Sequence, residues 1–133
     1  MPRYLLDTNH AGTLLRRDAP LWDRLRAARG SQFGLSRPTV GELWFMVFNS
    51  TRVQDNRRRL ELILPTFAMF DFDAESAIEY GQVRAELRRS GKPIPAIDGL
   101  IAAIARHQQL TLLTADAHFG HVAGLQMENW LAP

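Results

Sequence analysis

Short apolar runs alternate with longer amphipathic segments along the chain of 133 residues. The apolar runs predict strands over residues 3–7, 32–36, 67–72, 110–114 and 125–130. The segments between them predict helices over residues 19–29, 40–48, 53–64, 73–91 and 96–107, with a further short helix that Asn9 can cap. Strands that alternate with helices form right-handed crossovers, so we expect an α/β fold: a mainly parallel sheet with helices on both faces, as one domain over residues 1–133.

Residues that commonly begin or end helices support these boundaries. Ser36 precedes the helix that carries residues 40–48, and Pro38 falls in its first turn, where a missing N–H costs little. Asp73 is expected to cap the long helix, and Gly91 to end it.

Four carboxylates stand out against apolar surroundings. Asp7 ends the first predicted strand and Asp116 follows the fourth, so both are expected at the carboxyl edge of the sheet, where sites in such folds lie. Glu42 is the only charged residue in 40–48, and Asp98 is the only one in 94–105. We expect both helices to be largely buried, since they are apolar on nearly every side. No cation lies three or four residues from either acid, so each needs a partner from elsewhere in the fold.

Each acid also has an ordinary structural explanation. Asp7 and Asp116 lie at strand ends, where an aspartate is most often a helix cap or turn residue. Asp98 could cap the helix after Pro95, and Glu42 could pair with a distant arginine. If the four converge, their charges repel and raise one another's pKa, which a divalent cation would relieve. Oxygen ligands in a chain without cysteine point to Mg²⁺ or Mn²⁺, which can activate water for attack on phosphorus.

The charge balance fits a polyanionic partner. The chain has 16 Lys and Arg residues, of which only Lys92 is lysine, against 14 acidic residues, for a formal net charge of +2. Without the four negative charges of the proposed site, the remaining residues carry +6. An acidic hollow in a basic surface suits a metal site that acts on nucleic acid.

The composition indicates in which cellular compartment the protein is expected. With 46% hydrophobic and 23% charged residues, the chain is globular rather than disordered. The absence of cysteine, of a long apolar segment and of room for a signal peptide leads us to expect a cytoplasmic protein.

Four segments resemble the PIN domain, and in their order and spacing they are most similar to the VapC toxins of bacterial toxin–antitoxin pairs. These segments are 6–9 (LDTN), 40–43 (VGEL), 95–102 (PAIDGLIA) and 113–119 (LTADAHF). The resemblance implies a three-layer α/β/α sandwich and a Mg²⁺- or Mn²⁺-dependent endoribonuclease that cleaves tRNA, rRNA or mRNA. It also implies a homodimer and a cognate antitoxin that inserts a peptide into the active-site groove.

The resemblance further implies residue roles. The catalytic residues would be Asp7, Glu42, Asp98 and Asp116, with the metal held by Asp7, Asp98 and Asp116 and supported by Asn9 and Thr114. The family often has asparagine where this chain has Ala115, which removes an amide that could orient water.

Several other residues have two interpretations. Arg84, Arg88, Arg89 and Lys92, near the end of the long helix, form either a solvated face or phosphate contacts beside the site. The aromatic residues of 44–48 are core by default, and otherwise part of an interface. His118 lies near the site in sequence, and the metal mechanism assigns it no role.

Three other functions compete. A response-regulator receiver needs a lysine at a late strand end, whereas Lys92 precedes the Asp98 helix. A haloacid-dehalogenase-type phosphatase needs Asp-x-Asp, whereas position 9 is asparagine. The remaining alternative is a catalytically weak or inactive PIN domain that acts as an RNA- or protein-binding scaffold, which Ala115 slightly favours and the intact set of four acids opposes.

Overall fold

A parallel five-stranded sheet forms the centre of the computed structural model, which describes residues 2–132. Its strands are β1 (Arg3–Leu6), β2 (Gln32–Ser36), β3 (Ala68–Phe70), β4 (Thr111–Leu113) and β5 (Met127–Glu128). They lie in the order β3-β2-β1-β4-β5, and every neighbouring pair is parallel. The predicted strands are all present, although β3 and β5 are shorter than expected.

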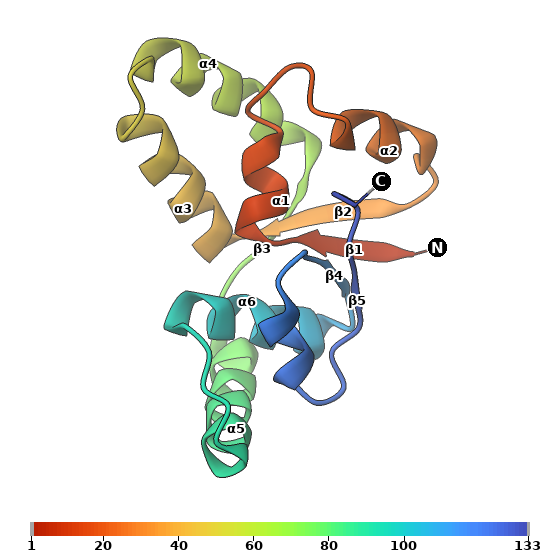
Figure 1. Ribbon diagram of the computed structural model, residues 1–133, viewed down its shortest axis with the longest axis vertical. Coiled ribbons are helices and arrows are strands. Elements are labelled where there is room, and N and C mark those ends of the chain that lie inside the picture. The colour runs from red at the N-terminus through yellow and green to blue at the C-terminus, as the bar shows by residue number, and fades with distance from the viewer. Residues whose placement is uncertain (1, 133) are drawn as a thin grey trace.

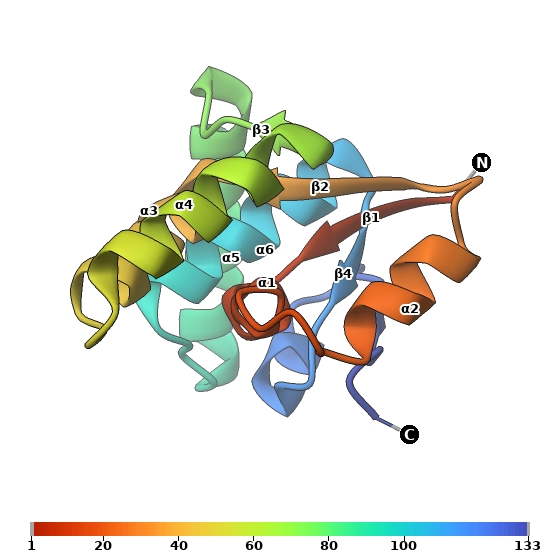
Figure 2. The same cartoon turned by 90° about the horizontal axis from the view of Figure 1, so that it is seen from above.

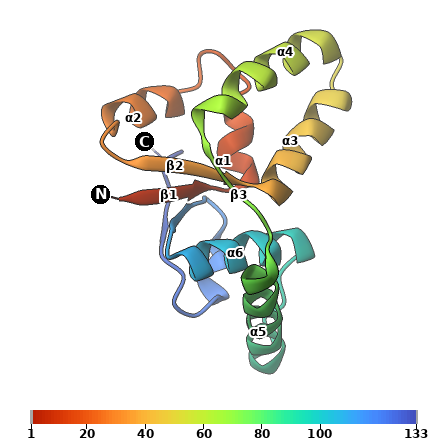
Figure 3. The same cartoon turned by 180° about the vertical axis from the view of Figure 1, so that it is seen from behind.

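Helices cover both faces of the sheet (Figure 1). On one face lie α1 (Thr8–Thr13), α2 (Leu21–Ala27), α3 (Arg37–Phe48) and α4 (Val53–Ile63), and on the other lie α5 (Ala74–Ser90) and α6 (Ala96–Gln108). The view from behind shows the same three layers (Figure 3). Two short 3-10 helices, η1 (Leu64–Thr66) and η2 (Ala117–His121), complete the chain. The expected three-layer α/β/α sandwich is therefore confirmed.

Each face of the sheet has its own hydrophobic core. Alternate residues of β1 point in opposite directions, so Leu6 packs into the core under α1–α4 and Leu5 into the core against α5 and α6. Among the described residues, no helix combines the length and apolar character that crossing a bilayer requires.

The predicted helix ends are mostly correct. The Ser36 hydroxyl accepts a hydrogen bond from the Thr39 amide at 3.2 Å, and the Asp73 carboxylate accepts one from the Ser76 amide at 2.9 Å. Gly91 ends α5 with φ +70°, a conformation that glycine adopts without steric cost. The prediction that Asn9 caps α1 is wrong. Asp7 is the cap, because its backbone is still extended and its carboxylate accepts from the His10 amide at 2.8 Å.

The helix that carries Glu42 is less buried than predicted. Phe45 and Phe48 of α3 are 62% and 58% exposed, because no further layer covers the side of α3 turned away from α1 and the sheet. The expectation holds for α6, where residues 101–105 are all buried between the sheet and α5.

Arg106 joins α5 and α6, the two helices that cover one face of the sheet (the lower layer in Figure 1). From α6 its guanidinium donates to Glu79 and Glu86 of α5, the latter at 2.9 Å, and to the carbonyl of Ala123 at 3.0 Å. These hydrogen bonds hold the pKa of Glu86 below its ordinary value. Since α6 carries Asp98, the Arg106 contacts help to fix the position of that acid.

We expect Arg106→Met to lower the free energy of unfolding by about 2 kcal/mol, because it leaves two partly buried carboxylates unpaired. Because folding lowers the pKa of Glu86, this stabilisation is present above the unfolded-state pKa and is lost as the pH falls through the folded-state value. The difference in the free energy of unfolding between wild type and variant should therefore become smaller at acidic pH. Urea unfolding at several pH values measures it. The control is Arg58→Met, which breaks an exposed pair with Asp55 and should cost less than about 0.5 kcal/mol.

Candidate functional site

The four predicted acids line one small pocket. Its volume is about 250 Å³, and its lining residues are Asp7, Thr8, Asn9, Glu42, Ile97, Asp98, Asp116 and Phe119. Asp7 follows β1 and Asp116 follows the neighbouring strand β4, so the parallel sheet brings both to its carboxyl edge. Glu42 comes from α3 in one helical layer, and Asp98 comes from the first turn of α6 in the other.

Asp7 is both a helix cap and part of the pocket. Its side chain is nearly buried, and its Oδ1 accepts a hydrogen bond from the His10 amide at 2.8 Å. Figure 2 shows α1 leading directly from the end of β1, which leaves Asp7 at the junction between them. The capping contact uses Oδ1, so Oδ2 is available to the pocket that Asp7 lines.

Asp98 has no structural role as a helix cap. Pro95 occupies the N-cap position of α6, and no side chain makes a capping hydrogen bond there. Burial is the main cause that raises the pKa of Asp98, and the negative charges of Asp116 and Asp7 raise it further, while His118 opposes them. Three of the acids are therefore close enough to repel one another, as expected from the sequence.

Asp116 is held by its neighbours in sequence. The Thr114 hydroxyl accepts from the Asp116 amide at 3.0 Å, and Asp116 Oδ1 accepts from the His118 amide at 3.3 Å. Thr114 is buried and does not line the pocket, so its contribution is to hold the backbone on which Asp116 stands.

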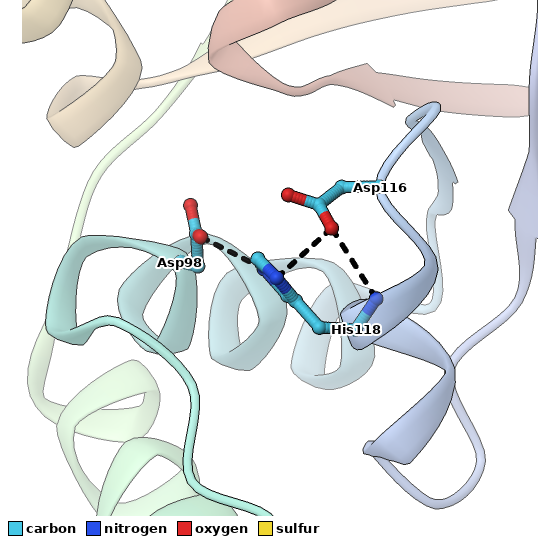
Figure 4. A group of neighbouring side chains, drawn as sticks. All are labelled: Asp98, Asp116 and His118. Carbon is cyan, nitrogen blue, oxygen red and sulfur yellow. Dashed lines mark hydrogen bonds and ion pairs between the residues drawn. The ribbon is translucent and has the colours of Figure 1, made fainter.

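His118 lies between two of the acids (Figure 4). Its Nε2 is 2.8 Å from Asp98 Oδ2, and its Nδ1 is 2.9 Å from Asp116 Oδ1. One ligand atom from each of these three residues lies within 4.8 Å of the others, a spacing that could hold a metal ion. Sequence reasoning gave His118 no role. The available signal was its position, two residues after Asp116 and directly before Phe119, whose burial turns the segment back toward the sheet.

Glu42 and Asn9 lie at the same pocket. Glu42 is partly buried, and among residues 2–132 no cationic side chain lies within ion-pairing distance of it, so the alternative of a distant arginine partner is wrong. Asn9 is more exposed and lines the pocket one residue after Thr8.

The four basic residues predicted to bind substrate do not form one surface. Arg84 and Arg88 line a separate groove of about 720 Å³ between α5 and the segment 93–96. Arg89 borders a different hollow beside His121, and Lys92 is exposed beyond the helix end. The groove and the acidic pocket meet the first turn of α6 at adjacent residues, since Gly99 lines the groove and Asp98 lines the pocket.

Known proteins are similar to this chain in sequence and in fold. The family model of the PIN domain matches residues 4–125. The chain is 32% identical to the tRNA(fMet)-specific endonuclease VapC of Shigella flexneri over 132 residues, which covers 98% of this chain and 99% of the relative. It is also 32% identical to ribonuclease VapC2 of Haemophilus influenzae, covering 98% of this chain and 100% of that one. Among solved structures, VapBC2 from Rickettsia felis bound to a promoter DNA fragment superposes with a TM-score of 0.90 at 28% identity, covering 96% of this chain and 98% of that one.

We expect Thr114→Val to lower the free energy of unfolding by about 1–2 kcal/mol, because the Asp116 amide loses its acceptor in a partly buried loop. Valine keeps the shape of threonine, so little packing is lost. Urea unfolding tests this. The matched control is Thr111→Val at the other end of β4, where the hydroxyl meets only the Gln126 side chain at the surface and the change should stay within about 0.5 kcal/mol. Equal effects of the two substitutions would contradict the assigned role.

Proposed function

The chain belongs to the PIN-domain family, among its VapC members, and we propose that it is a divalent-metal-dependent endoribonuclease that acts as the toxin of a toxin–antitoxin pair. The observation that carries the proposal is the convergence of Asp7, Glu42, Asp98 and Asp116 on one pocket from four different elements. This convergence has no benefit for folding, since the acids repel one another there.

The residues of the pocket fit a hard divalent cation. Asp7, Asp98 and Asp116 offer carboxylate oxygens, and Asp98 is partly buried without a capping bond or an arginine partner among the described residues. Such an oxygen set favours Mg²⁺ or Mn²⁺. We assign the ion to these three residues, with Asn9 and Thr114 in support.

The chain's own residues would prepare the reaction. A divalent cation in the pocket would supply activation of water and charge compensation at the scissile phosphate. Glu42 lines the same pocket as the aspartates and would accept hydrogen bonds from a water molecule there, which would orient that water toward phosphorus. The apolar side chains of Ile97 and Phe119 border the same pocket.

A structured RNA is the proposed substrate. The Shigella flexneri relative is named for its specificity toward tRNA(fMet), so initiator tRNA is the first RNA to test. The chain matches that relative over nearly its whole length, and the acidic pocket opens onto a surface whose remaining charge is basic.

We expect Asp98→Asn to reduce metal-dependent cleavage of initiator tRNA by at least about 100-fold, because even outer-shell partners of metal sites cost up to that much. In the wild type Mg²⁺ or Mn²⁺ should raise the melting temperature, and in Asp98→Asn it should raise it less. The control is Asp23→Asn on α2, an exposed acid paired with Arg26, which should change neither measurement.

This pair of measurements also separates the enzyme from the inactive scaffold. Wild-type protein that binds folded RNA but cleaves none, with any of the divalent cations, would be a binding module. Undiminished cleavage by Asp98→Asn would show that the reaction does not take place in this pocket.

Arg84 and Arg88 are proposed to contact RNA phosphates from the neighbouring groove. They lie four residues apart on the same side of α5, and both line the groove that adjoins the acidic pocket.

Replacing either arginine by glutamine in the Asp98→Asn background should weaken RNA binding. The slope of log affinity against log salt should fall by about 0.7–0.9 for each phosphate that the protein no longer neutralises. Filter binding at several salt concentrations measures the slope. Arg52→Gln, an exposed change at the start of α4, serves as the control and should leave it unchanged. Equal slopes for wild type and all variants would contradict the proposal that Arg84 and Arg88 contact RNA.

We further propose that a cognate antitoxin and a second copy of the chain are its protein partners. The Rickettsia felis and Salmonella typhimurium relatives of known structure are VapBC assemblies on DNA. The exposed rings of Phe45 and Phe48, with Leu62 on α4 also exposed, offer an apolar surface for such a partner.

A further inference from the structure

His10 is a fully buried histidine for which the proposed chemistry has no role. It lies in α1, three residues after Asp7, and none of its surface is exposed. Polar ring nitrogens in such a place need partners, since burying them unsatisfied is costly. The partners of the two nitrogens of His10 lie at opposite ends of the chain.

The first partner fixes the tautomer of the ring. The backbone amide of Trp130 donates to His10 Nε2 at 3.1 Å. Because a backbone amide can only donate, Nε2 must be unprotonated, and the proton of the ring is therefore on Nδ1.

The second nitrogen faces the site. His10 Nδ1 is buried, has no regular hydrogen-bond partner among the described residues, and lies 3.2 Å from Asp7 Oδ1. The His10 backbone amide donates to that same oxygen at 2.8 Å. The backbone amide and the ring nitrogen of one residue thus both face Oδ1, which leaves Oδ2 of Asp7 for the pocket.

The donor at the other end is itself held firmly. The Trp130 ring packs against Tyr4 and Phe33, with centroid distances of 4.9 and 5.6 Å, and the guanidinium of Arg24 lies 5.1 Å from its centroid. The Trp130 indole also donates to Glu128 at 2.9 Å. The amide that faces His10 is therefore part of a rigid aromatic cluster.

We propose that His10 is a positioning residue for the divalent cation: through Nδ1–H it orients the Asp7 carboxylate, and the Trp130 amide holds the ring in the tautomer that can do so. Partners of this kind, which donate to a ligating carboxylate, typically contribute 10- to 100-fold in metal affinity. This inference rests on the proposed function, because it requires Asp7 to bind the ion.

Two substitutions separate the two nitrogens. In His10→Asn the side-chain amide takes the place of Nδ1–H and keeps a donor toward Asp7, but the Trp130 amide loses its acceptor. In His10→Gln the longer side chain places its carbonyl oxygen near the position of Nε2 and keeps the contact with Trp130, but the donor to Asp7 is absent. Binding of Mn²⁺ alone, measured by titration calorimetry without RNA, and the melting temperature are recorded for both.

We expect His10→Gln to lose Mn²⁺ affinity by about 10-fold with a melting temperature near that of wild type. We expect His10→Asn to keep its Mn²⁺ affinity within about 2-fold but to melt about 5 °C lower, since a buried amide is left unpaired. His107→Gln on the exposed end of α6 is the control for a histidine replaced far from the pocket, and should change neither value.

Unchanged Mn²⁺ binding in His10→Gln, or an equal loss in both variants, overturns the inference while leaving the proposed function intact. Failure of the wild type to bind Mn²⁺ contradicts the proposed function, and this inference with it. Long-range ¹H–¹⁵N NMR of the wild type provides a check that does not depend on any variant: we expect the His10 proton on Nδ1, and a proton on Nε2 would refute the arrangement.

Discussion

Repulsion among carboxylates at one edge of the sheet is the constraint on which this molecule depends. Burial is the largest cause that raises the pKa of Asp98. His118 opposes it, and the charges of Asp116 and Asp7 raise the pKa further, so the fold holds the three carboxylates together at a cost in free energy. The free energy for this comes from elsewhere, chiefly from the two hydrophobic cores on either face of the sheet. The pocket therefore lowers the stability of the fold locally, and the packing of the remaining chain offsets that loss.

Local contacts hold Asp7 and Asp116 in place against that repulsion. Asp7 is fixed as the cap of α1, Asp116 is fixed by the Thr114 hydroxyl and the start of η2, and Asp98 stands in the first turn of α6. These contacts come from backbone amides and a hydroxyl group rather than from arginine or lysine side chains. A side-chain partner is present in His118, whose ring nitrogens lie 2.8 Å from Asp98 and 2.9 Å from Asp116.

The sequence predicted those parts of the structure that depend on short-range pattern. The order of strands and helices, the Ser36 cap and the end of α5 at Gly91 all follow from residue type and spacing. The convergence of the four acids was predictable because parallel strands have one carboxyl edge, and because Glu42 and Asp98 lie in otherwise apolar segments.

What the sequence could not reveal depends on three-dimensional neighbours. The exposure of Phe45 and Phe48 depends on how many layers cover α3, and an apolar composition does not determine that. Arg84 and Arg88 lie on one side of α5. Arg89, one position further along the helix, lies on another side, so residues that cluster in the sequence line two different surfaces. The contacts of His10 and His118 form only once the chain has folded, and the sequence around a histidine does not indicate which partner it will contact.

The position of the pocket has a mechanical consequence. α3 belongs to the layer above the sheet and α6 to the layer below, so Glu42 and Asp98 approach one another only if both layers keep their places on the sheet. Arg106 fixes α6 to α5 in the lower layer, and the contact between His10 and Trp130 fixes α1 to the end of the chain in the upper one. Contacts outside the pocket lining therefore help to set the separation of its carboxylates. Since the affinity of a hard cation depends steeply on that separation, the metal binding that we propose would be a property of the whole sandwich rather than of four residues.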